Sequence, residues 1–178
     1  MAHEYDAELV AQGIKTLLEV EMEDALDAVE AVWVTNGDAV TLPDVVTWHF
    51  GFKPTVLEMD SDAFPFVSVF DTGANPTEKR ADWGFQEEQF PVMIDYFVVG
   101  TTEENCAKVC SRYAQAIRAI LQAERVIEGY HQVNWKPQVA ISEMIRHGVT
   151  TESDLLVSAA AAVNYIQGGR VSVLMEGG

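Results

Sequence analysis

The stretch YFVVGTTEENCAKV, residues 96–109, holds the residues best arranged for nucleotide chemistry. An apolar run passes there through Gly100 and two threonines into a helical pattern, and such a turn can bind phosphate through backbone amides. A phosphate loop needs several glycines and usually a lysine, whereas VGTTEE has one glycine, no lysine and two carboxylates. The same residues match a capping box, with Thr101 as the N-cap and Glu104 reaching back to its amide. We therefore expect a capped helix start here and no anion site.

The residue types that bind metals are scattered along the chain. The histidines are His3, His49, His131 and His147, and neither an HExxH nor a CxxC spacing occurs. Cys106 and Cys110 lie one turn apart in a predicted helix, where disulfide geometry is unfavourable, so we expect reduced and partly buried thiols. These patterns predict no metal site and no cofactor.

Two further groups of residues resemble parts of catalytic sites. Asp60-Ser61-Asp62 matches the DxD of metal-dependent sugar transferases, but at the end of a strand we expect a solvated turn. Ser142 has Glu143 and His147 nearby, yet no G-x-S-x-G motif is present and only a fold could assemble a triad from them. The sequence therefore predicts no catalytic residues and a protein that is not an enzyme.

An excess of carboxylates dominates the composition. The 178 residues include 28 acidic and 11 basic side chains, for a net charge of −17. A chain of this charge repels phosphate backbones and anionic membranes, which argues against a broad nucleic-acid face or membrane adsorption. The acidity fits either a saline habitat or a surface that DNA must pass without binding. No apolar run reaches about 18 residues, the length of a membrane span, and the N-terminus MAHEYDAELV lacks the features of a signal peptide.

Two amphipathic helices are expected to position the rest of the chain. Apolar residues spaced by three and four predict a helix over 5–32, with a break near Glu19–Glu23 and a solvated acidic face. A second helix is expected at about 103–125, with an apolar inner stripe that begins at Cys106. Its outer face is expected to carry Lys108, Arg112, Arg118 and Glu124.

Strand signals occupy most of the remaining chain. FPVMIDYFVVG (90–100) is the strongest of them, and its two apolar faces predict a central strand covered by helix on at least one side. Residues 154–169 are interpreted as a long strand that Gly168-Gly169 stops, and RVSVLMEGG as an edge strand or docking tail. The other expected segments are strands at 55–60, 64–71 and 139–145, an extended segment at 35–54 with alternating aromatics, a polar excursion at 72–88 and an extended segment at 126–135.

These elements predict an α+β fold in a single domain, residues 1–178. A mixed or antiparallel sheet of about four to five strands packs against the helix at about 103–125, and the N-terminal helix adds to it. The loop 72–88 is expected to extend from the body, as is a C-terminal arm at 168–178.

The order of these elements resembles a known family. LLEVEMEDALDAVEA, VTLPDVVTWHFG, FPFVSVFD and then FPVMIDYFVVGTTEENCAKVCSRYAQAIRAIL follow one another as in the neck and tail-completion proteins of long-tailed bacteriophages, most closely the tail terminators. The central piece, strand–Gly–Thr-x-x-Glu–helix with Arg112-Tyr113 and Ala116-Ile117 within it, carries most of the resemblance. It covers roughly two-thirds of the chain.

The resemblance implies a structural virion protein. Subunits would form a homo-oligomer, a hexameric ring that caps the tail tube and joins it to the head–neck connector proteins. DNA would pass through the lumen without specific binding, and no catalysis is implied. The protein would belong to the virion tail or neck and would be in the host cytoplasm during assembly. In that case we expect the loop 72–88 and the C-terminal RVSVLMEGG to contact other subunits or the tube.

Three alternatives stay open. A head-completion or adaptor protein of the neck would use the same kind of ring subunit. A small enzyme or ligand-binding domain would line a pocket with aromatic residues, namely Trp48, Phe50, Phe52, Trp83 and Phe85. A DNA mimic would display its carboxylates on one face and bind a DNA-binding protein.

Overall fold

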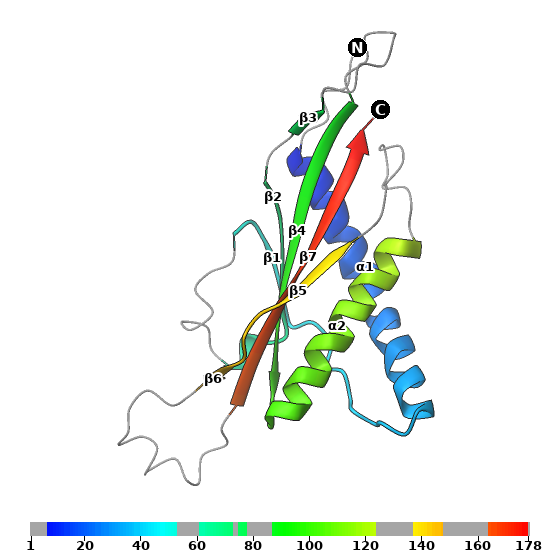
Figure 1. Ribbon diagram of the computed structural model, residues 1–178, viewed down its shortest axis with the longest axis vertical. Coiled ribbons are helices and arrows are strands. Elements are labelled where there is room, and N and C mark those ends of the chain that lie inside the picture. Colours follow the sequence, from blue (N-terminus) through cyan, green and yellow to red (C-terminus); the bar gives the residue numbers. More distant parts are fainter. Residues whose placement is uncertain are drawn as a thin grey trace, which may run out of the picture.

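The computed structural model describes residues 7–52, 61–72, 75–77, 87–123, 137–147 and 164–177 (Figure 1). The elements in chain order are α1 (Ala7–Thr35), β1 (Thr47–Phe50), the short 3-10 helix η2 (Ser61–Ala63), β2 (Phe66–Asp71), β3 (Asn75–Thr77), β4 (Glu87–Gly100), α2 (Glu103–Ala123), β5 (Gln138–Ile141), β6 (Ile145–His147) and β7 (Asn164–Gly177).

The described strands form one mixed sheet in the order β1-β2-β4-β7-β5, with β3 paired to β4 and β6 paired to β7. β1 is parallel to β2, and the other pairs are antiparallel. β4 and β7 run side by side as the long strands in the middle of Figure 1, from the pair Glu88–Gly177 to the pair Gly100–Tyr165. Two helices packed on a mixed sheet confirm the predicted α+β class.

Both long helices cover the same face of the sheet, here called the helix face. Residues of β4 at alternate positions, Val92, Ile94, Tyr96 and Val98, share one buried cluster with the apolar stripes of α1 and α2. Burial of one such aliphatic side chain contributes about 1.5–3 kcal/mol, so the helix face is the main source of stability. The stripe of α1 recurs every fourth residue without a proline, and the helix runs through the expected break near Glu19–Glu23. Its buried members are Val10, Ala11, Ile14, Leu18, Met22 and Leu26.

The opposite side of the sheet, here called the second face, carries the other alternate residues of each strand. Neither α1 nor α2 lies on it, and a smaller aromatic cluster is buried there. Its members are Phe64, Phe66, Phe97 and Ile166, with Val99 packed against them. The predicted alternation in β4, with Asp95 and Phe97 on the face opposite Tyr96, is confirmed.

The prediction that Gly168-Gly169 stops a strand is wrong, because β7 runs straight through both glycines. Tyr96 is the cross-strand partner of Gly169, and Phe97 is the partner of Gly168. A Cβ atom on Gly169 would lie 2.2 Å from the Tyr96 hydroxyl oxygen, and one on Gly168 would lie 2.3 Å from a Phe97 ring carbon. The two rings therefore occupy the space that side chains at these positions would need, one ring on each face.

Other expectations are corrected in the C-terminal half. Residues 168–177 do not form an arm, because they belong to β7 and pair with β4 along their whole length, with β5 on the other side of residues 169–172. The segment 139–145 is divided between β5 and β6. Within the loop predicted at 72–88, residues 75–77 form β3 and residues 87–88 begin β4. The expected segments at 55–60 and 126–135, and residues 73–74, 78–86 and 154–163, lie outside the described residues.

The glycine–aromatic pairs predict a sharp cost for a small substitution. Gly169→Ala should lower the free energy of unfolding by about 1–3 kcal/mol, because the new methyl group overlaps the Tyr96 ring. In a Tyr96→Leu background the same change should cost less, since the ring is gone. Thermal unfolding of the four proteins of this double-mutant cycle measures the coupling. Strictly additive effects would contradict a steric origin.

Candidate functional site

The turn between β4 and α2 has a structural role, because it caps the helix and lets it start in direct contact with the strand. The Thr102 hydroxyl accepts a hydrogen bond from the Asn105 amide at 3.1 Å, so the N-cap is Thr102 rather than the expected Thr101. Glu104 does not reach back to the cap but forms an ion pair with Lys108 at 2.7 Å. A Cβ atom on Gly100 would lie 2.6 Å from the backbone nitrogen of Cys106, so glycine lets the helix start directly against the strand. The helix-start interpretation is confirmed, with the cap one residue later.

The two cysteines are buried and free, as expected from their spacing. The Cys106 thiol donates to the Tyr165 carbonyl oxygen at 3.2 Å, and the Cys110 thiol contacts the Tyr96 hydroxyl at 3.8 Å. Burial raises the pKa of each thiol from 9.0 to about 11. Both groups are therefore protonated at neutral pH and are poor nucleophiles and metal ligands.

The remaining metal-type residues stay apart in the structure. Within the described ranges, no three His, Cys, Asp or Glu side chains come together in a way that could hold a metal ion. The His49 ring stacks beside Phe66 at 6.0 Å between centroids, and Asp62 lies in η2. His147 ends β6, whereas His3, Asp60 and His131 are outside the described part of the chain.

The Ser142 side chain helps to hold two strands together. Its hydroxyl donates to the Gly168 carbonyl oxygen at 2.9 Å and accepts from the Gly168 amide at 3.2 Å. These two bonds fasten the end of β5 to β7. Glu143 beside it is exposed.

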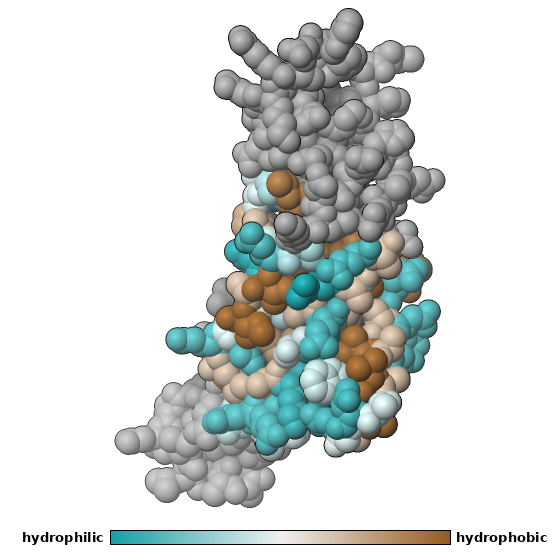
Figure 2. Space-filling model, turned by 45° about the vertical axis from the view of Figure 1, so that its right-hand side comes forward, coloured by the Kyte–Doolittle hydropathy of each residue, from teal (hydrophilic) through white to brown (hydrophobic). Residues whose placement is uncertain are grey.

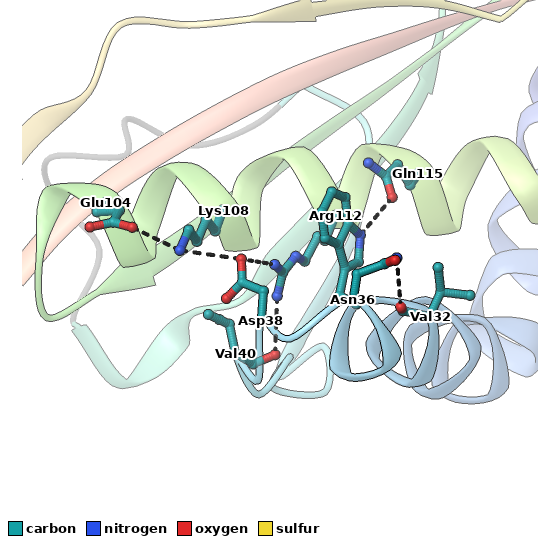
Figure 3. Close-up of polar contacts among 9 residues, drawn as sticks. Val32, Asn36, Asp38, Val40, Glu104, Lys108, Arg112 and Gln115 are labelled. Atoms are coloured by element: carbon teal, nitrogen blue, oxygen red, sulfur yellow. Dashed lines mark hydrogen bonds and ion pairs between the residues drawn. The ribbon is translucent and has the colours of Figure 1, made fainter.

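A polar cluster joins the C-terminal end of α1 to α2 (Figure 3). Asp38 accepts hydrogen bonds from Arg112 at 2.6 Å, and Lys108 lies 3.2 Å from the same carboxylate. The Arg112 guanidinium also stacks on the Trp33 ring at 4.6 Å and donates to the Val40 carbonyl oxygen. The expectation that Arg112 stays outside is wrong, because the turn after α1 folds over α2 and leaves this side chain 3% exposed.

The acidic face of α1 is solvated, as predicted, and two of its carboxylates also make specific contacts. Glu19, Glu21, Glu23, Asp24 and Asp27 are exposed. Glu19 forms an ion pair with Lys15 at 2.5 Å. Glu30 is half-buried and accepts a hydrogen bond from the Leu42 amide at 2.8 Å, which ties the segment after α1 to the helix. The carboxylates thus form a charged surface along α1.

The second face holds a bidentate ion pair in the middle of the sheet. Asp95 is 3% exposed and accepts from the Arg170 guanidinium at 2.6 and 2.8 Å, across the β4–β7 ladder. The guanidinium lies over the Phe70 ring at 5.6 Å, and its side chain is 48% exposed. This pair was missed from the sequence, where Asp95 and Arg170 lie 75 residues apart.

A cavity of about 290 Å³ opens beside this pair. Its lining residues, besides Asp95 and Arg170, are Phe97, Ala140, Ile141, Ser142, Gly168 and Gly169. The cavity lies beside the part of the β4–β7 ladder where the glycine–aromatic pairs occur.

The alternating aromatics of the segment 35–54 divide between the two faces. Trp48 and Phe50 pack against the helix-face core, so they do not line the cavity. Phe52 is 78% exposed, and Trp83 and Phe85 lie outside the described residues. On the side of the molecule that Figure 2 shows, hydrophobic patches lie separately among hydrophilic residues.

Comparison with known proteins finds weak structural likeness. No protein-family model matches the chain, and no curated protein matches it. Among solved structures, the sheath/tube terminator of PVC, an extracellular contractile injection system, in its extended state is similar at a TM-score of 0.33 and 15% identity. The match covers 88% of this chain but 56% of that one, so the chain spans a little over half of its length. At this TM-score the likeness carries no argument about function, which must come from the chain's own residues.

Among the described residues, no helix combines the length and apolar content needed to cross a bilayer.

The polar cluster predicts a pH-dependent stability. Burial opposes ionisation of Asp38, but hydrogen bonds and charges of Lys108 and Arg112 lower its pKa below the ordinary 3.8. A depressed carboxyl pKa stabilises the fold above the ordinary pKa, and this contribution is lost as the pH falls through the folded-state value. Asp38→Asn should therefore lower the melting temperature at pH 7 and have a vanishing effect well below pH 3.8. Asp27→Asn, on the exposed side of α1, is the matched control. An effect of Asp38→Asn that is equal at both pH values would contradict this role.

The thiols predict low reactivity. At pH 8 a thiol of pKa about 11 has roughly a hundredth of the thiolate of one at 9.0, and burial restricts access further. Cys106 and Cys110 should react with a disulfide reagent at least about 100-fold more slowly in the folded protein than in denaturant. Absorbance of the released thiol measures both rates. Fast labelling of the folded protein would show that one thiol is accessible.

Proposed function

We propose that the protein is a ring-forming structural subunit, a tail terminator that caps a tail tube and joins it to the head–neck of a phage-type particle, with no catalysis of its own. The chemistry of the two sheet edges carries this proposal. β1 and β5 end the order of the described sheet, and their sequences, TWHF and QVAI, contain no charged residue in a chain of net charge −17. Natural edge strands are usually protected by lysine, proline or a bulge. Lys136 and Pro137 come directly before β5, but neither strand contains a lysine or proline itself, which favours pairing of these edges with other subunits.

Contacts between opposite edges of like subunits generate a ring when the rotation from one subunit to the next closes, and a ring is what we propose here. Six copies is the number that the resemblance to tail terminators implies. The acidic surface along α1 and the net charge of each subunit would repel a DNA phosphate backbone, so DNA passes the lumen without specific binding. The expected partners are further copies of the chain, the tail tube protein and the neck or connector proteins. The expected location is the virion tail, reached from the host cytoplasm during assembly.

Two other functions compete with this one. A head-completion or adaptor role in the neck requires the same ring-forming surface and differs in position within the particle. A small ligand-binding domain is favoured by the cavity on the second face. A thermal-shift screen against nucleotides, sugars and metal ions tests that alternative, because a specific ligand would raise the melting temperature.

Native mass spectrometry and negative-stain imaging of the purified protein test the ring. We expect one closed oligomer with a central opening. Labelled protein in an assembled particle should lie at the end of the tail tube, whereas a position at the portal would assign the adaptor role. A protein that stays monomeric under every condition and is absent from particles would overturn the proposal.

The net charge predicts that assembly depends on salt. Subunits of charge −17 repel one another at about 0.01 M salt, where the Debye length is about 30 Å, and much less at about 1 M, where it is about 3 Å. Ring formation should therefore strengthen as salt rises over this range. Sedimentation velocity at matched protein concentration measures the oligomer fraction. Rings that dissociate at high salt would indicate that ion pairs, rather than uncharged edges, hold the subunits together.

A further inference from the structure

The outer side of β1 carries backbone hydrogen-bonding groups that its neighbour β2 does not use. Thr47 and Gly51 donate their amide hydrogens to carbonyl oxygens on the β2 side, at 3.2 and 2.9 Å. The backbone groups of successive residues point to alternate sides of a strand. Those of Trp48 and Phe50 therefore point away from β2, and among the described strands β1 pairs with β2 alone.

The outer side of β5 has the same property at the other end of the described sheet. The Ser142 amide donates to the Gly168 carbonyl oxygen of β7 at 2.9 Å. By the same alternation, the backbone groups of Ile141 and Val139 point away from β7. Among the described residues, each end of the sheet thus presents two residues whose backbone groups pair with no other strand.

The directions of the two edge strands allow one copy to pair with another. Because β1 is parallel to β2 and each later pair in the order is antiparallel, β1 runs opposite to β5. A second copy placed beside the first in the same orientation therefore brings its β1 antiparallel to β5, with both helix faces on the same side. Trp48, Phe50 and Val139 pack against the helix-face core, and Ile141 lies on the same side as Val139. Their side chains would thus continue one face of a joined sheet.

One register joins all four of these residues. Trp48 then lies opposite Ile141 and Phe50 opposite Val139, and each pair exchanges two backbone hydrogen bonds. A shift by two residues would either place Phe50 opposite Pro137, which has no amide hydrogen, or carry Trp48 past the end of β5. A shift by one residue would turn the side chains of the two strands to opposite faces. The backbone therefore selects a single alignment of the two edges.

Charge favours a second copy as the occupant of each edge. Two molecules of net charge −17 approach with least repulsion where neither carries a charged side chain. TWHF and QVAI are two such segments, since they contain no Asp, Glu, Lys or Arg. An edge of one copy thus meets the opposite edge of the next without bringing like charges together in the two strands.

We infer that β1 of one copy pairs antiparallel with β5 of the next, with Trp48 opposite Ile141 and Phe50 opposite Val139. The contact joins two different surfaces, so its repetition generates a head-to-tail assembly, which is a ring when the rotation between copies closes. This inference rests on the proposed ring and names the backbone pairs that would hold it together.

A cross-link between two copies tests the register. In this pairing His49, which stacks on Phe66 of the second face, lies directly opposite Ala140 of the next copy. The Cα atoms of such a non-hydrogen-bonded pair are about 4.5 Å apart, within the range of a disulfide. A 1:1 mixture of His49→Cys and Ala140→Cys chains should therefore form, on mild oxidation, a disulfide-linked dimer with one chain of each kind. Intact-mass spectrometry measures it, and the native cysteines are buried.

The position of the second thiol provides the matched control. Ile141→Cys in place of Ala140→Cys moves the thiol to the other face of β5, so at most about a tenth of this dimer is expected. Rings that form without the His49–Ala140 cross-link would overturn the inference and leave the ring proposal standing. A disulfide dimer from either single-cysteine chain alone would show that like edges meet, which would also overturn the head-to-tail pairing.

A proline in the edge tests the hydrogen bonds separately. Ile141→Pro removes an amide hydrogen that points away from β7, so the pairing within the chain is kept and the protein should fold. Self-association should weaken about tenfold or more, because the Trp48 carbonyl oxygen of the neighbouring copy loses its donor. Ile141→Val retains the amide and should assemble like the wild type. Thermal unfolding and sedimentation velocity measure folding and assembly.

The outcomes separate this inference from the proposed ring. An Ile141→Pro protein that folds and forms rings like the wild type would overturn the inference alone. A wild-type protein that is monomeric at every salt concentration would overturn both.

Discussion

The register of the β4–β7 ladder is the constraint on which the rest of the structure depends. Tyr96 and Phe97 lie over Gly169 and Gly168 from opposite faces, and a one-residue slip in either direction would place one of the two rings opposite Gln167 or Arg170. Every other strand pairs with one of these two strands or with a neighbour of them. The helix α2 begins at the end of β4, where Gly100 allows direct contact with Cys106. The position of the helices, the edges and the cavity therefore follows from one pairing.

The two faces of the sheet are stabilised in different ways. The helix face is apolar and closed by α1 and α2, and at its margin Arg112 and Lys108 of α2 contact Asp38 in the turn after α1. The second face places a bidentate ion pair, Asp95 with Arg170, directly on the ladder. Asp95 is buried but the Arg170 side chain is 48% exposed, so solvent screens part of the attraction between them. The pair joins directly opposite residues of β4 and β7. It reinforces the same pairing that the glycines define.

Among the described residues, several groups that the sequence offers for chemistry have structural roles. The thiols are buried and protonated, the threonine at the start of α2 caps a helix, and Ser142 links β5 to β7. What the described surface offers to other molecules is a pair of uncharged sheet edges, an exposed phenylalanine and a cavity, on a protein whose charge opposes nonspecific contact. In the proposed ring, the two uncharged edges are the surfaces through which subunits would contact each other.

The sequence by itself determined the class of the fold, both helices and the central strand, because their apolar periodicities are long and unambiguous. It also determined the excess of negative charge and the buried state of the cysteines. Only the tertiary structure decided that residues 168–177 lie inside the sheet, that Arg112 is buried and that Asp95 meets Arg170. Each of these depends on a partner far away in the chain: two aromatic rings make Gly168-Gly169 part of a strand, and a distant carboxylate lets an arginine leave the solvent. Local patterns cannot report such pairs, since their energies exist only once the chain has folded.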